Sequence, residues 1–126
     1  MNKKFATAIN CIDGRVQLPV IDWLKKEAQI DYVDMITEPG PNKVLSENKD
    51  RVVIESIKKR VGISIERRNS RLIAIVGHFD CLGNPSNKDI QLQDIKNAIE
   101  VVKTWELDAK IIGLWVDENF NVNPSD

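Results

Sequence analysis

At residues 71–78 the chain reads RLIAIVGH, five consecutive apolar residues between Arg71 and Gly77. A continuous apolar run of this length is typical of a central parallel strand that is covered on both faces. Three more short apolar runs predict strands, and apolar residues at helical spacing predict the helices between them. We expect strands at residues 5–12, 32–37, 72–76 and 111–116, and helices at 18–29, 48–60 and 89–105.

The alternation of strands and helices predicts an α/β protein of three layers. A central, mostly parallel sheet of four strands in the order 2-1-3-4 would carry helices on both faces. At 126 residues, the chain is expected to form one domain over residues 1–126.

Three segments are expected to interrupt or end this pattern. The Pro- and Gly-containing segment from Glu38 to Asn42 is expected to be a loop, and Gly62 is expected to break or kink the second helix. The acidic end of the chain, from Asp117 to Asp126, is expected to be a frayed tail.

The composition argues against several kinds of partner. The net charge is −1, with 42% hydrophobic and 29% charged residues, which is ordinary for a globular protein. This balance gives no reason to expect nucleic acid or a membrane surface as a partner. No apolar run approaches the ~20 residues of a membrane helix, and no signal peptide is recognisable. We therefore expect a cytoplasmic protein whose cysteines stay reduced.

The chain contains one histidine and two cysteines, and all three lie in two short motifs. Cys11 ends the first strand, and His78 and Cys81 follow the third. In the expected sheet these strands are neighbours, and ligands of open α/β sheets bind beyond the carboxyl ends of such strands. Two thiolates and one imidazole fill three corners of a zinc tetrahedron and leave one open, as in a catalytic site. The sequence therefore predicts a Zn²⁺ site formed by these three residues.

Asp13 and Arg15 follow Cys11 closely, which gives the open corner charged neighbours. Asp13 could accept a hydrogen bond from a zinc-bound hydroxide, or occupy the fourth metal position itself. Arg15 could hold the carboxylate in a bidentate pair. We expect a switchable site, open when the two residues are paired and closed when Asp13 binds zinc. The simpler alternatives are a hydrogen-bonded histidine, buried cysteines that act as small apolar residues, and an ordinary turn former at Asp13.

These motifs resemble those of the β-class carbonic anhydrases. Their signature is Cys-x-Asp-x-Arg followed by a strand that ends in Gly-His-x-x-Cys, and the resemblance spans about residues 4–118. It implies a zinc enzyme in which a zinc-bound hydroxide hydrates CO2 to bicarbonate, working as a homodimer or a multiple of it. It also implies that Cys11, His78 and Cys81 hold the zinc. Asp13 and Arg15 would then be the gating and orienting pair.

Other functions stay open beside this one. The same hydroxide could attack another linear electrophile, so a zinc hydrolase acting on carbonyl sulfide or carbon disulfide is an alternative. Leu82 stands where the family has glycine, and acidic Glu38 stands where it has a basic residue. The short length of the chain and the acidic loop at Glu38 favour a non-catalytic, zinc-binding regulatory module as a further alternative. The last alternative is an interaction domain that binds no metal.

Overall fold

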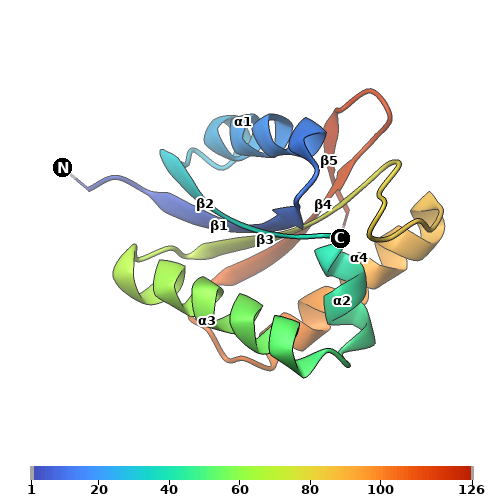
Figure 1. The fold of residues 1–126 in the computed structure, drawn as a ribbon. Helices are drawn as coiled ribbons and strands as arrows, with labels where there is room; N and C mark the ends of the chain where they lie inside the picture. Colours follow the sequence, from blue (N-terminus) through green and yellow to red (C-terminus); the bar gives the residue numbers. More distant parts are fainter. Residues whose placement is uncertain (1, 126) are drawn as a thin grey trace.

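The computed structural model describes residues 2–125 and contains one five-stranded sheet in the order β2-β1-β3-β4-β5 (Figure 1). The first four strands are parallel, and β5 pairs with β4 in the antiparallel direction. The strands are β1 (Phe5–Cys11), β2 (Tyr32–Glu38), β3 (Leu72–His78), β4 (Lys110–Val116) and β5 (Val122–Pro124). The α/β class and the 2-1-3-4 order of the four parallel strands are therefore confirmed.

Helices cover both faces of the sheet, as predicted (Figure 1). They are the short 3₁₀ helix η1 (Gly14–Val16), α1 (Gln17–Glu27), α2 (Pro41–Glu47), α3 (Arg51–Arg67) and α4 (Lys88–Lys103). The helix α1 lies on one face, while α2, α3 and α4 lie on the other. Within the part of the chain that the structure covers, no helix has the length and apolarity needed to span a bilayer.

The apolar run of β3 is buried on both faces of the sheet. Ile73 and Ile75 pack in the core beneath α2, α3 and α4, whereas Ala74 and Val76 pack against the α1 side. Successive side chains of a strand point to opposite faces, so a strand covered on both sides must be apolar throughout. This explains why the 72–76 run shows no alternation of apolar and polar residues.

The prediction of a loop at residues 38–42 is wrong for residues 41 and 42, which belong to α2. Gly40 has a left-handed backbone, with φ of 54°, and Pro41 then occupies the first position of α2. Proline is favourable there because its fixed φ suits a helix and its missing N–H would have had no helical partner. The helix predicted at 48–60 corresponds to α3, which runs from Arg51 to Arg67. The helix α2 was not predicted, and Asn48–Asp50 separate it from α3.

Gly62 does not break the second helix, because α3 continues through it to Arg67. The apolar stripe of Ile57, Val61 and Ile65 runs past this position and packs on the sheet. A buried stripe of this kind outweighs the ~1 kcal/mol disadvantage of one glycine in a helix interior.

The frayed tail predicted from residue 117 is also wrong. Val122–Pro124 forms β5 along the open edge of β4, and Val122 packs against the core on the α1 side. Residue 126 of the predicted tail lies outside the described residues. The chain end therefore covers a sheet edge beside the two motifs.

Candidate metal centre

The two motifs converge at the carboxyl ends of neighbouring strands. Cys11 is the last residue of β1 and His78 the last of β3, and Cys81 lies three residues further on. One ligand-capable atom from each of the three lies within 4.8 Å of the others. All three side chains are at most 3% exposed. The sheet thus brings together the three residues that the sequence singled out.

His78 presents one ring nitrogen that is available to a metal. The Nδ1 atom lies 2.8 Å from the carbonyl oxygen of Phe79, which can only accept, so Nδ1 carries the hydrogen. In the neutral ring this leaves Nε2 with a free lone pair. Nε2 is buried and finds no hydrogen-bond partner within residues 2–125. Histidines that bind metals are typically oriented by such a bond from the other ring nitrogen, so His78 fits a metal site.

The thiols of Cys11 and Cys81 are free, and their sulfur atoms lie 3.8 Å apart. The two thiols are hydrogen-bonded to each other, which lowers the pKa of Cys11 although burial opposes this. The same bond, together with burial, raises the pKa of Cys81. The backbone N–H of Asn84 donates to the Cys81 sulfur at 3.3 Å. The lowered pKa shifts Cys11 toward the thiolate, the form that binds zinc.

Asp13 and Arg15 form the predicted ion pair, with 2.7 Å between Arg15 Nη2 and Asp13 Oδ2. The Nε atom of Arg15 also donates to both carboxylate oxygens, at 3.1 and 3.2 Å. Asp13 in addition accepts the backbone N–H of Arg15 at 2.9 Å and so caps η1. The side-chain bond from Arg15 lowers the pKa of Asp13 to about 2. Of the two arrangements that the sequence left open, the structure has Asp13 paired with Arg15.

Arg15 has further contacts that the sequence did not predict. Its Nη1 lies 3.3 Å from the carboxylate of Asp80, and its Nη2 donates to the carbonyl of Asp80 at 3.1 Å. Its guanidinium also lies over the ring of Phe120, 5.9 Å from the centroid. The side chain of Arg15 therefore joins the segments that follow β1, β3 and β4. Nothing in the local pattern around Asp80 or Phe120 indicates these contacts, because they form between distant loops.

Two glycines let the loops after β2 and β3 touch. A Cβ atom on Gly40 would lie 2.5 Å from the backbone carbon of Gly83, and one on Gly83 would lie 2.4 Å from that of Pro39. These distances are shorter than any van der Waals contact, so only glycine fits. The close approach fixes the segment that carries Cys81 against the segment beyond Glu38.

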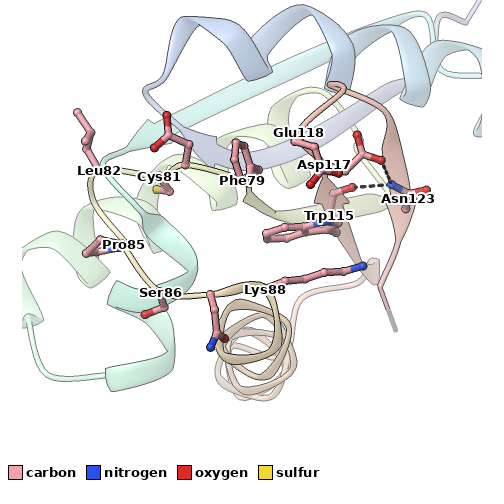
Figure 2. A pocket seen from close by; sticks show the side chains of 12 residues that line it. Phe79, Cys81, Leu82, Pro85, Ser86, Lys88, Trp115, Asp117, Glu118 and Asn123 are labelled. Carbon is pink, nitrogen blue, oxygen red and sulfur yellow. Dashed lines mark hydrogen bonds between the residues drawn. The ribbon is translucent and has the colours of Figure 1, made fainter.

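A cavity of about 710 Å³ opens beside the centre (Figure 2). Among the three convergent residues, only Cys81 lines it. Figure 2 shows the ring of Trp115 in the middle of this cavity, with Lys88 below it and Asp117 and Glu118 on the far side from Cys81. The remaining lining residues are Phe79, Asp80, Leu82, Pro85, Ser86, Asn87 and Asn123.

Three buried amide side chains, Asn42, Asn84 and Gln91, form a hydrogen-bonded group behind His78 that the sequence analysis missed. The sequence does contain an indication of a buried role for Gln91. Gln91 occupies the helical position before Ile95 on the apolar face of α4 and is only 1% exposed. A polar residue on a buried helical stripe indicates a specific partner.

The fold and the site define the class as an α/β protein with a buried Cys2His cluster at the carboxyl edge of a parallel sheet. Residues 1–125 match the protein family described as "Putative carbonic anhydrase". The chain belongs to this family.

A solved structure supports the fold independently. The chain is similar to the crystal structure of β-carbonic anhydrase isoform I from the protozoan Trichomonas vaginalis, with a TM-score of 0.59 and 18% sequence identity. The match covers 98% of this chain and 82% of that one. Comparison with curated proteins finds no match.

Proposed function

We propose that the protein is a zinc-dependent carbonic anhydrase that hydrates CO2 to bicarbonate, with Zn²⁺ held by Cys11, His78 and Cys81. One observation carries the proposal: three soft donors lie within 4.8 Å of one another, and the Nε2 atom of His78 lacks a hydrogen-bond partner in the described part of the chain. Zinc favours this mixture of thiolate and imidazole. Membership of the carbonic anhydrase family supports the same reaction.

Zinc, when bound, supplies a Lewis acid that can lower the pKa of water to about 7. The residues of the chain orient the reactants around it. The carbonyl of Phe79 holds the ring of His78 through Nδ1, and Arg15 holds the carboxylate of Asp13. Asp13 is ionised at neutral pH because its pKa is about 2, so it can accept a hydrogen bond from the attacking water. The net reaction consumes one CO2 and one water and releases bicarbonate and a proton to solvent.

Stopped-flow CO2 hydration between pH 6 and 9 tests this proposal. Zinc-loaded protein should bind one equivalent of zinc and exceed the uncatalysed rate. Asp13→Asn keeps the shape of the side chain but weakens it as an acceptor, so it should keep the zinc and lose roughly 100-fold or more in kcat/KM. Background rates in the wild-type protein with zinc bound would reject the anhydrase. They would favour the non-catalytic zinc module instead.

A second candidate is a hydrolase that acts on carbonyl sulfide or carbon disulfide. The observation that favours it is the apolar part of the cavity beside Cys81, where Phe79, Leu82 and Trp115 lie. These substrates are apolar and linear, as CO2 is. Sulfide release from carbonyl sulfide or carbon disulfide, measured beside CO2 hydration on the same zinc-loaded sample, separates the two activities.

We also propose a homodimer in the cytoplasm. Four large apolar side chains are exposed at the edge of the sheet that bears the candidate centre: Ile12, Phe79, Leu82 and Phe120. A second copy would cover them. Free thiols at a metal site suit a reducing compartment, and fractionation of cells against marker proteins tests that location.

A further inference from the structure

The side chain of Gln91 forms hydrogen bonds with both the backbone N–H and the backbone carbonyl of His78. Its Oε1 accepts the N–H of His78 at 3.2 Å, and its Nε2 donates to the carbonyl of His78 at 2.8 Å. Gln91 projects from the first turns of α4, which packs against β3. One side-chain amide therefore fixes the main chain of His78 from behind, while the imidazole faces the two sulfur atoms.

The same amide also reaches the loop that carries Cys81. The Nε2 atom of Gln91 donates to the carbonyl of Asn84 at 3.2 Å and lies 3.5 Å from that of Ser86. The N–H of Asn84 in turn donates to the sulfur of Cys81. A single side chain thus ties together the backbone that presents His78 and the backbone that supports Cys81.

Two buried asparagines hold Gln91 in place. Asn42 of α2 donates to the Oε1 atom of Gln91 at 3.2 Å. Asn84 donates to the Oδ1 atom of Asn42 at 3.3 Å and to the carboxylate of Asp94 at 2.9 Å. Asn42, Asn84 and Gln91 are each at most 1% exposed. The Oδ1 atom of Asn84 finds no hydrogen-bond partner within residues 2–125. Each of the three amides is nevertheless bonded to another of them, which restricts the arrangements they can adopt.

Gly77 leaves room for this arrangement directly before His78. A Cβ atom there would lie 2.8 Å from Nδ2 of Asn42 and 3.0 Å from Oε1 of Gln91. An apolar residue at position 91 would suit the stripe of Ile95, Ala98 and Val102 better, because burying an amide costs free energy unless it is bonded. The network lies directly behind His78 and beside the loop of Cys81, so the free energy that its burial costs supports the candidate metal centre.

We infer that Gln91 is a positioning residue of the metal centre, which holds His78 and the Cys81 loop in the arrangement that binds zinc. The inference rests on the zinc site of the proposed function. Residues that orient metal ligands typically contribute about 10–100-fold to metal affinity. We expect Gln91→Met, which keeps the length but removes every hydrogen bond, to weaken zinc binding within that range.

The experiment compares Gln91→Met with Gln93→Met on the same helix. Gln93 is exposed and bonds only to Asn97 among the described residues, so its replacement controls for the new side chain. Zinc affinity is measured by competition with a chromophoric chelator, at a temperature where circular dichroism shows each metal-free protein folded. The absorption of the Co²⁺-loaded proteins reports the geometry at the metal. It should change in Gln91→Met and stay like the wild type in Gln93→Met.

The outcomes separate this inference from the proposed function. No zinc binding by the wild-type protein would overturn both. Wild-type binding together with unchanged affinity and Co²⁺ spectrum in folded Gln91→Met would overturn only the positioning role. Should Gln91→Met not fold, Asn42→Ala removes one support of Gln91 and keeps its bonds to His78. It should lose zinc affinity several-fold, and wild-type affinity in that variant would overturn the inference.

Discussion

At the scale of single residues, Gly40 is a position where one added carbon atom should clearly lower the stability of the fold. Its φ of 54° is unfavourable for other residues, and an added Cβ would lie 2.5 Å from the backbone of Gly83. Gly40→Ala should therefore lower the free energy of unfolding by about 1–3 kcal/mol from backbone strain alone. Urea denaturation of the metal-free protein measures this.

Gly14 provides the comparison for that substitution. An added Cβ at Gly14 would meet nothing within 4 Å in residues 2–125, and its φ is not in the left-handed region. Gly14→Ala should change the stability by much less than Gly40→Ala. Equal effects of the two substitutions would contradict the role assigned to the Gly40–Gly83 contact.

The residues of the site differ in how far the sequence reveals them. Cys11, His78 and Cys81 could be predicted because soft donors are rare in this chain and lie at the ends of recognisable strands. Asp80 and Phe120 could not be predicted, because each meets Arg15 only after loops from different strands come together. Their roles depend on tertiary contacts that no local pattern encodes.

At the scale of elements, α3 offers a substitution that should stabilise the protein. Gly62 lies inside this helix, and an added Cβ would meet nothing within 4 Å among residues 2–125. Alanine restricts the unfolded chain and favours the helix, so Gly62→Ala should raise the free energy of unfolding by about 0.5–1 kcal/mol. The urea midpoint should rise with an unchanged slope. A fall would show that α3 needs the glycine.

The hairpin between β4 and β5 shows why the end of the chain could not be predicted. Its turn is organised by Asp117, whose carboxylate accepts the N–H groups of Asn119 and Asn121, each at 3.0 Å. These bonds lower the pKa of Asp117. Acidic and Asn-rich segments are common in both turns and frayed ends, so the composition alone could not separate the two. In the structure, Trp115 of β4 pairs with Asn123 of β5, so this segment forms a hairpin.

At the scale of the whole molecule, the order of the parallel strands could be predicted because strands and helices alternate along the chain and right-handed crossovers leave few possible orders. The helix α2 could not, since it begins at Pro41 inside a Pro- and Gly-containing segment that is typical of a loop. What closes α2 is Asn48, which has a left-handed backbone with φ of 54°. Single-residue caps of this kind carry little weight in an apolar pattern, although they determine where a helix ends.

Metal removal should reveal how much the centre contributes to the folded state. A ligand that binds only the folded protein at 100 times its Kd stabilises it by about 2.7 kcal/mol. For a domain of this size that corresponds to a fall in Tm on the order of 10 °C when a chelator strips the zinc. Differential scanning calorimetry with and without chelator measures the shift. His78→Ala, which lacks the imidazole, should show almost no response to the chelator.

The proposed dimer makes a prediction that separates two exposed apolar residues. Leu82 is 93% exposed at the edge that bears the candidate metal centre, and Val52 is 82% exposed at the start of α3. A charge on Leu82 would be buried in the interface, so Leu82→Glu should sediment as a monomer. Wild-type protein and Val52→Glu should sediment as dimers. A wild-type monomer, or equal behaviour of both variants, would contradict an interface at Leu82.

The two cysteines of the candidate centre lie 70 positions apart along the chain, and this separation bears on how the protein is made. A ribosome must release β1, β2, β3 and the helices between them before all three side chains are outside the exit tunnel. The pairing of β1 with β3 must then bring them together. In the proposed function, zinc would therefore bind only after β1 and β3 have paired, whereas in zinc fingers it templates folding. Under that proposal, metal acquisition would come late in the maturation of each newly synthesised copy.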